Sequence, residues 1–270
     1  MKTIIKWGAI AAFAVIAPLS AEAHRAWILP AGTVFSAENP WVTVDLAISN
    51  DIFFFEHRPM PVERVRVTAP DGSEVKPENV STGRLRSVMD LQLTRQGTYR
   101  IASVMGGVFA RWMENGEPKR WRGPVEALSR EVPAGARDLV VTHAVNRVET
   151  YVTAGKPTID NLRPTGEGLE LEPITHPNDL YAEETATFRL LIDGAPAANV
   201  EVEVIRDGIR YRDSLDEIKI RTDADGRFSV TWPEAGCYWL SAEYQDHKPR
   251  LPQAHERRAT YVVTLEVLPQ

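Results

Sequence analysis

The sequence predicts an all-β protein with two β-sandwich domains behind a secretory signal peptide. Three observations support this fold class. Runs of alternating apolar and polar residues recur along the chain, turn sequences separate them at intervals of about ten residues, and helical periodicity is scarce. The single cysteine, Cys237, excludes an intramolecular disulfide, so a hydrophobic core alone must stabilise the fold.

The first 23 residues have the features of a signal peptide. Lys2 and Lys6 provide the positive start, an apolar run extends from residue 7 to 19, and small residues at Ala21 and Ala23 suit a signal peptidase. We therefore expect cleavage after Ala23 and a mature chain that begins with His24. No other stretch has the eighteen or more apolar residues of a membrane helix, so we expect no integral membrane protein.

Residues 24–155 are expected to form the first sandwich. The run at 41–49 alternates cleanly, and its apolar residues share one face. Further strands are expected at 62–69, 86–94, 97–105 and 139–155, the last as one long strand or a bent pair. The Pro-Asp-Gly at 70–72 is a typical turn sequence.

Residues 105–136 lack clean periodicity and predict a long ordered loop with one short helix within 124–132. Long excursions from a rigid sheet often carry function, so Trp112 and Trp121 in this segment are candidate partner-binding residues.

Residues 156–165 are rich in proline and polar residues and predict a linker to the second sandwich, 166–270. Strand-like runs fill this second half at 169–174, 185–194, 199–207, 217–245 and 257–269. Asp225-Gly226 lies between two alternating runs and predicts a hairpin turn. The apolar neighbours of Cys237 predict a buried, unreactive thiol.

The formal net charge is −6, and the first 23 residues hold two Lys and one Glu, so the remainder carries −7. An acidic balance argues against nucleic acid or an anionic membrane as partner and suits a cation. G-x-S-x-G, H-E-x-x-H, C-x-x-C and P-loop motifs are all absent from the sequence, so we expect no enzymatic activity.

The order of landmarks resembles the periplasmic family called domain of unknown function 4198. The landmarks are an A-H-x-x-W start at residue 23, then LELEPITHPNDL, LLIDGAPAANVEVEV, TDADGRFSVTWPEAGCYWLSAEY and a closing ATYVVTLEVLP. The C-terminal half is also similar to transthyretin-like and carboxypeptidase-regulatory-like sandwiches. The resemblance implies a periplasmic protein linked to cobalt or nickel uptake, placed near an outer-membrane receptor or an inner-membrane transporter.

A terminal His24 is a strong metal ligand, because its free α-amine and its ring Nδ1 close one chelate ring. A second imidazole would complete a three-nitrogen set that suits Cu(II) or Ni(II). The best candidate is His57, which is close to Asp51 in the segment SNDIFFFEHRPM, and the family resemblance points to the same positions. We therefore predict that His24, Asp51 and His57 bind a divalent transition metal, with Ni, Co, Cu and Zn all open.

Plainer interpretations remain for each residue. His57 is otherwise a surface-loop histidine, Asp51 an Asx turn, and Trp27 a core residue rather than a wall of the site. His247 and His255 suggest a second weak metal site or a solvated loop. Two other functions compete: an adaptor sandwich that binds a receptor, protein or glycan, and a copper redox enzyme with a terminal-histidine brace.

Overall fold

The computed structural model describes residues 24–133 and 135–270, and the predicted signal peptide lies outside them. Within these residues the strands form three sheets, so the all-β prediction is confirmed. No helix in this part of the chain has the length and apolar character needed to cross a bilayer.

The N-terminal sheet has the strand order β1-β3-β8-β7, with β4 added beside β3. Its strands are β1 (Arg25–Pro30), β3 (Trp41–Ser49), β4 (Arg58–Pro59), β7 (Glu78–Thr82) and β8 (Ser87–Gln92). The predicted alternation of β3 is confirmed, because Val42, Val44, Leu46 and Ile48 are all buried. A 3-10 turn, η1 (Val62–Arg64), follows β4.

The central sheet is the largest and draws on both halves of the chain. Its order is β16-β15-β18-β19-β11-β9-β5-β6, with β10 beside β9 and β2 beside β11. From the first half come β2 (Val34–Phe35), β5 (Val65–Thr68), β6 (Glu74–Val75), β9 (Gly97–Glu114), β10 (Glu117–Gly123) and β11 (Arg137–Ala154). From the second half come β15 (Glu201–Arg206), β16 (Ile218–Arg221), β18 (Gly236–Asp246) and β19 (Glu256–Val267).

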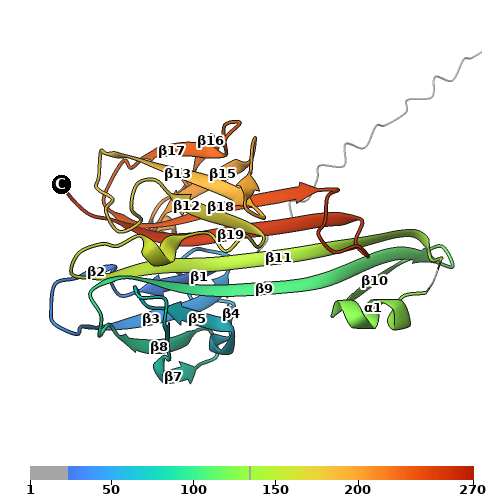
Figure 1. The fold of residues 1–270 in the computed structure, drawn as a ribbon, viewed down its shortest axis with the longest axis horizontal. Coiled ribbons are helices and arrows are strands. Elements are labelled where there is room, and N and C mark those ends of the chain that lie inside the picture. The colour runs from blue at the N-terminus through green and yellow to red at the C-terminus, as the bar shows by residue number, and fades with distance from the viewer. Residues whose placement is uncertain (1–23, 134) are drawn as a thin grey trace, which may run out of the picture.

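The C-terminal sheet contains β12 (Leu169–Pro173), β13 (Thr185–Ile192), β14 (Ala195–Pro196) and β17 (Arg227–Thr231). The two smaller sheets lie on opposite faces of the central sheet, as Figure 1 shows. The core residues explain why the central sheet has a smaller sheet on each face. On β11, Val148 and Val152 pack into the core beneath the N-terminal sheet, whereas Tyr151 packs into the core beneath the C-terminal sheet. Neighbouring strand residues point to opposite faces, so one strand serves both cores.

The segment 105–136 is more regular than predicted. β9 continues to Glu114 and β10 folds back beside it, so most of the expected loop is a hairpin that extends from the body (Figure 1). The expected short helix is present as α1 (Val125–Glu131). The sequence did not predict these strands because no other layer of the fold covers one face of the arm. Apolar residues are not required on that face, so the alternation of apolar and polar residues is weak.

The Asp225-Gly226 hairpin prediction is wrong, although the turn itself is present. β16 pairs with β15 in the central sheet, whereas β17 pairs with β13 in the C-terminal sheet. Gly226 has a φ of 77°, and a Cβ there would lie 2.4 Å from the carbonyl oxygen of Leu190. The glycine is therefore required for close packing of the turn against β13.

The predicted linker packs closely against the body. It contains the 3-10 turn η2 (Asp160–Leu162), and the Asn161 amide donates to the carbonyl oxygens of Thr68, Ala69 and Thr98. A third 3-10 turn, η3 (Ile209–Tyr211), follows β15.

The Cys237 thiol is partly buried. This burial, together with the nearby carboxylates of Glu266 and Asp207, raises the pKa of the thiol to about 12, as expected for an unreactive thiol.

A buried polar network lies between the central and C-terminal sheets. The carboxylate of Glu149 is fully buried and accepts hydrogen bonds from the hydroxyls of Tyr151 and Tyr261, at 2.6 and 2.7 Å. The guanidinium groups of Arg100 and Arg147 lie 3.4 and 3.7 Å from its other oxygen. This carboxylate therefore balances two buried cations at the junction of the halves.

We predict that Glu149→Ala lowers the free energy of unfolding by about 3–5 kcal/mol, because the buried Arg100 loses its ion-pair partner and Arg147 keeps only Glu170. Urea denaturation measures this. The matched control is Glu243→Gln, which removes an exposed ion pair with Arg258 and should change stability little. Equal effects of the two substitutions would contradict the importance of the buried network.

We also predict that His176 makes the fold sensitive to acid. Burial lowers its pKa, and its Nδ1 accepts a hydrogen bond from the backbone N–H of Asn178, which protonation would break. In the unfolded chain this imidazole has its ordinary pKa of 6.5, so below that pH the unfolded chain binds more protons than the folded one. Stability therefore falls as pH drops through 6.5. His176→Gln should flatten the profile of unfolding free energy between about pH 5 and 7, whereas His247→Gln in an exposed loop should not.

Candidate functional site

His24 and His57 lie against each other at one end of the N-terminal sheet. Their ring centroids are 3.9 Å apart and the ring planes are inclined by 27°, so the imidazoles are stacked. Both side chains are exposed to solvent. The rings come together although 33 positions separate them in the sequence.

The pairing of β3 explains why the two histidines meet. Arg25, the first residue of β1, pairs with Ser49 at the end of β3. Arg58, the first residue of β4, pairs with Ile48 on the same strand. Each histidine immediately precedes one of these arginines, so both lie at the same end of β3.

Hydrogen bonds organise the residues around the pair. The ring Nδ1 of His24 lies 2.8 Å from the side-chain oxygen of Asn50, and the guanidinium of Arg25 donates to the Asn50 carbonyl at 2.9 Å. The backbone N–H of Asp51 points to the Glu56 carboxylate at 3.4 Å. The backbone N–H of Glu56 in turn donates to the Ser49 hydroxyl at 3.3 Å.

Three phenylalanines fasten the loop that carries His57. Phe53 and Phe55 pack against the fully buried Trp27, with ring centroids 5.8 and 6.2 Å away. The Arg86 guanidinium lies 4.6 Å from the ring of Phe55. Likewise, Arg210 from the second half lies 4.1 Å from the ring of Phe54. These contacts hold the loop from both halves of the chain, and Trp27 is the core residue that its bulk predicted.

The structure brings together two of the three predicted metal ligands. Among residues 24–133 and 135–270, no group of three or more His, Cys, Asp and Glu side chains is placed to hold a metal ion. Asp51 is half-buried and stays a predicted ligand. The third nitrogen in our prediction is the α-amine of His24, which is a backbone group and is not counted among these side chains.

The remaining histidines lie elsewhere. The Nδ1 of His255 accepts a hydrogen bond from the backbone N–H of Val141 at 2.9 Å, while His247 is exposed in the loop between β18 and β19. The candidate partner-binding residues Trp112 and Trp121 are half-buried in a small apolar cluster beside α1, and the indole N–H of Trp121 donates to Glu131.

Comparison with known families identifies the chain. The family described as "Domain of unknown function (DUF4198)" matches residues 21–246. The chain belongs to the DUF4198 family. A search of curated proteins finds no match.

Two solved structures illustrate a distant likeness to this DUF4198 protein. The D0-D1 domain of Intimin has 11% identity over 89% of this chain and 97% of its own, with a TM-score of 0.23. The human OSCAR ligand-binding domain has 15% identity over 91% and 100%, with a TM-score of 0.19.

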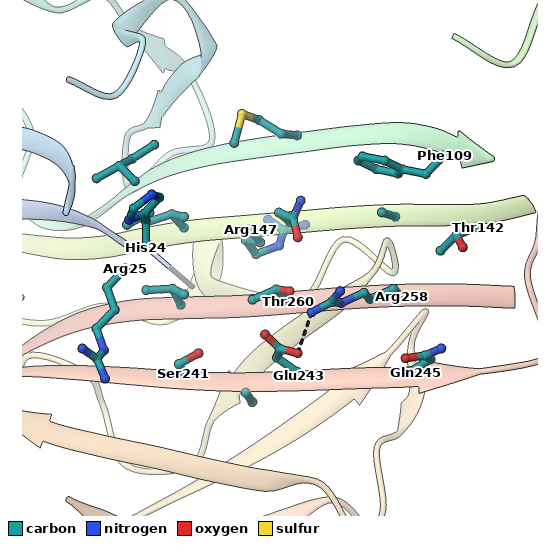
Figure 2. Close-up of a pocket in the computed structure, with 18 of the residues that line it drawn as sticks. His24, Arg25, Phe109, Thr142, Arg147, Ser241, Glu243, Gln245, Arg258 and Thr260 are labelled. Atoms are coloured by element: carbon teal, nitrogen blue, oxygen red, sulfur yellow. Dashed lines mark hydrogen bonds and ion pairs between the residues drawn. The ribbon is translucent and has the colours of Figure 1, made fainter. Parts of the chain in front are cut away.

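His24 also borders a broad groove in this DUF4198 protein. The groove has a volume of about 1230 Å³ and crosses the part of the central sheet that the N-terminal sheet leaves uncovered on its own face. Figure 2 shows His24 and Arg25 at one end and Phe109, Thr142 and Gln245 at the other. This groove was not predicted from the sequence. The sequence feature that could have indicated it is the presence of uncharged polar residues at alternate positions of the 139–155 strand, such as Thr142 and Asn146.

We predict that Phe55→Ala separates the two histidine rings, because the loop then loses its contacts with Trp27 and Arg86. In a chain that begins at His24, nuclear Overhauser contacts between the His24 and His57 ring protons should be present and should weaken in the variant. Phe109→Ala, in the distant arm, is the control and should leave them unchanged. Absence of these contacts in the wild-type chain would contradict the stacked geometry.

Proposed function

We propose that this protein is a non-enzymatic periplasmic accessory protein that binds a divalent transition metal ion for uptake. The observation that carries the proposal is the stack of His24 against His57. Imidazole is a common ligand for Zn, Cu and Ni, and the ion is the cargo of the protein. Nickel, cobalt, copper and zinc all remain open.

The arrangement has the donors that such an ion requires. Because metal–nitrogen bonds are about 2.0–2.1 Å long, two nitrogens that share an ion lie within about 4 Å of each other. The stacked rings are close enough for this, and each ring would rotate to direct a nitrogen at the ion. Nδ1 of His24 would exchange the amide oxygen of Asn50 for the metal. Cleavage after Ala23 would add the α-amine and close the chelate ring.

The surroundings favour reversible binding. The aromatic contacts of Phe53, Phe54 and Phe55 hold the loop in place, so little ordering entropy is lost when the ion binds. Both histidines are exposed, which allows an ion to arrive from and leave to solvent or a partner. We propose an outer-membrane receptor or an inner-membrane transporter as that partner.

The proposal is tested by titrating a chain that begins at His24 with Ni²⁺, Co²⁺, Cu²⁺ and Zn²⁺ by isothermal titration calorimetry. We expect one tight site for at least one of these ions. His24→Ala and His57→Ala should each weaken that site by at least about tenfold, since each removes a ligand nitrogen.

Two controls separate this site from adventitious binding. His247→Ala removes an exposed histidine elsewhere and should leave the affinity unchanged. A chain with one extra residue before His24 keeps both rings but converts the α-amine to an amide, so it should bind more weakly. An affinity that is insensitive to His24→Ala would refute the proposed metal site.

A further inference from the structure

The groove beside His24 has a floor of small side chains. Along β11 the floor extends from Thr142 to Val148, six residue steps and about 20 Å. Ala144 and Asn146 lie between them on the same face, and Thr260 and Ser241 continue the floor across β19 and β18 (Figure 2). The floor therefore offers hydroxyl, amide and methyl groups in rows that repeat every second residue.

Two arginines stand side by side at the end of the groove far from His24. Arg111 on β9 and Arg120 on β10 are directly opposite each other in the antiparallel ladder, and both line the groove. Both are exposed, and among the described residues neither guanidinium has a carboxylate within ion-pair distance. Like charges directly opposite across a ladder destabilise the pairing, so this arrangement costs stability in the free protein.

Charges elsewhere in the groove are arranged differently. Glu243 pairs with Arg258 at 2.9 Å, and Glu201 pairs with Arg221 at 2.9 Å. The side of the groove formed by β15 and β18 is therefore acidic, with Glu201 and Glu243 in ion pairs and Glu203 outside the ion pairs of the described residues.

The Arg111–Arg120 pair concentrates positive charge at the arm end of the groove, and Arg25 and Arg58 do so at the His24 end. The two guanidinium groups of the arm pair share one ladder position and are complementary to carboxylates.

We propose that the groove binds an extended peptide segment of a partner protein, with acidic residues of that segment held by Arg111 and Arg120. A strand-like segment of about six to eight residues spans the floor, with alternate side chains directed toward the sheet. The acidic end lies on the arm, and the other end reaches toward His24. This interaction does not require a metal ion.

The chemistry of the groove favours a peptide over other anionic chains. Sugar rings bind mainly by stacking on aromatic faces. Of the aromatic residues that line the groove, Trp239 is almost fully buried, Phe109 is covered by Arg122 at 5.1 Å, and Trp121 packs into the apolar cluster beside α1. A nucleic acid carries a phosphate at every step, so it would meet Glu201 and Glu203 on the acidic side. A peptide can place its carboxylates at one end only.

The test uses a synthetic peptide of four glutamates followed by four serines, titrated into the full mature chain in the absence of metal. We expect binding that perturbs the amide resonances of Ala144, Asn146 and Thr260. The double variant R111Q/R120Q should bind at least about tenfold more weakly, because charge-assisted hydrogen bonds are lost. R111K/R120K, which keeps the charge, should recover part of the affinity.

The matched control is R130Q/R137Q, which changes the net charge equally at two exposed arginines outside the groove. It should weaken binding less than about twofold. The thermal midpoint of R111Q/R120Q should equal or exceed that of the wild type, since like-charge repulsion is relieved. This result would show that its loss of binding does not come from unfolding.

Three outcomes would overturn the proposal. The first is no binding of the peptide to the wild-type chain. The second is equal weakening by R130Q/R137Q, which indicates unspecific attraction. The third is tighter binding of tetragalacturonate than of the peptide with the same dependence on the arginine pair, which assigns the groove to an acidic glycan. Metal titration is unaffected in all three, so the failure of this proposal is distinct from failure of the metal site.

Discussion

The parallel pairing of β11 with β19 is the interaction on which the architecture depends. It joins Thr142 to Glu256 at one end and Thr150 to Thr264 at the other, and so fuses strands from both halves into one central sheet. Each smaller sheet then needs only one face of this central sheet to close its core. Because the two cores lie on opposite faces, a change in the register of this pairing by one residue would exchange the apolar and polar faces of β19 and expose both cores.

The junction between the two halves of the chain is stabilised by polar contacts as well as by apolar packing. Glu149 on β11 binds the hydroxyl of Tyr261 on β19, and Arg147 beside it reaches Glu170 on β12 at 3.0 Å. Glu170 also accepts the backbone N–H groups of Thr165, Gly166 and Glu167 in the segment that joins the halves. Specific hydrogen bonds of this kind favour one arrangement of the layers over others that bury similar apolar area. The indole N–H of Trp239 adds a further tie, to the carbonyl oxygen of Ala26 on β1.

The candidate site and the groove are both consequences of this layering. The N-terminal sheet covers only part of one face of the central sheet, and the uncovered part becomes the floor of the groove. β1 lies at the boundary between the covered and uncovered parts of the central sheet. The residue before it, His24, therefore lies both at the edge of the groove and beside His57. The proposed metal site therefore adjoins the proposed peptide surface, and a partner bound in the groove would lie within reach of the ion.

Local alternation in the sequence was enough to determine the all-β class and the buried face of β3, because both depend on the chemistry of near neighbours. For residues 139–155 it left one long strand or a bent pair open, and the structure shows the single strand β11. The sequence also predicted the side chains that we propose as metal ligands, His24 and His57 among them. Only the tertiary structure decided that β1 and β4 flank the same end of β3, which brings those rings together, and that β16 and β17 part into different sheets despite the turn between them. It also decided that Arg111 faces Arg120 across the arm. Strand pairing joins residues far apart in the sequence, and closing a long loop costs only slightly more than closing a short one, so local patterns do not select the partner strand.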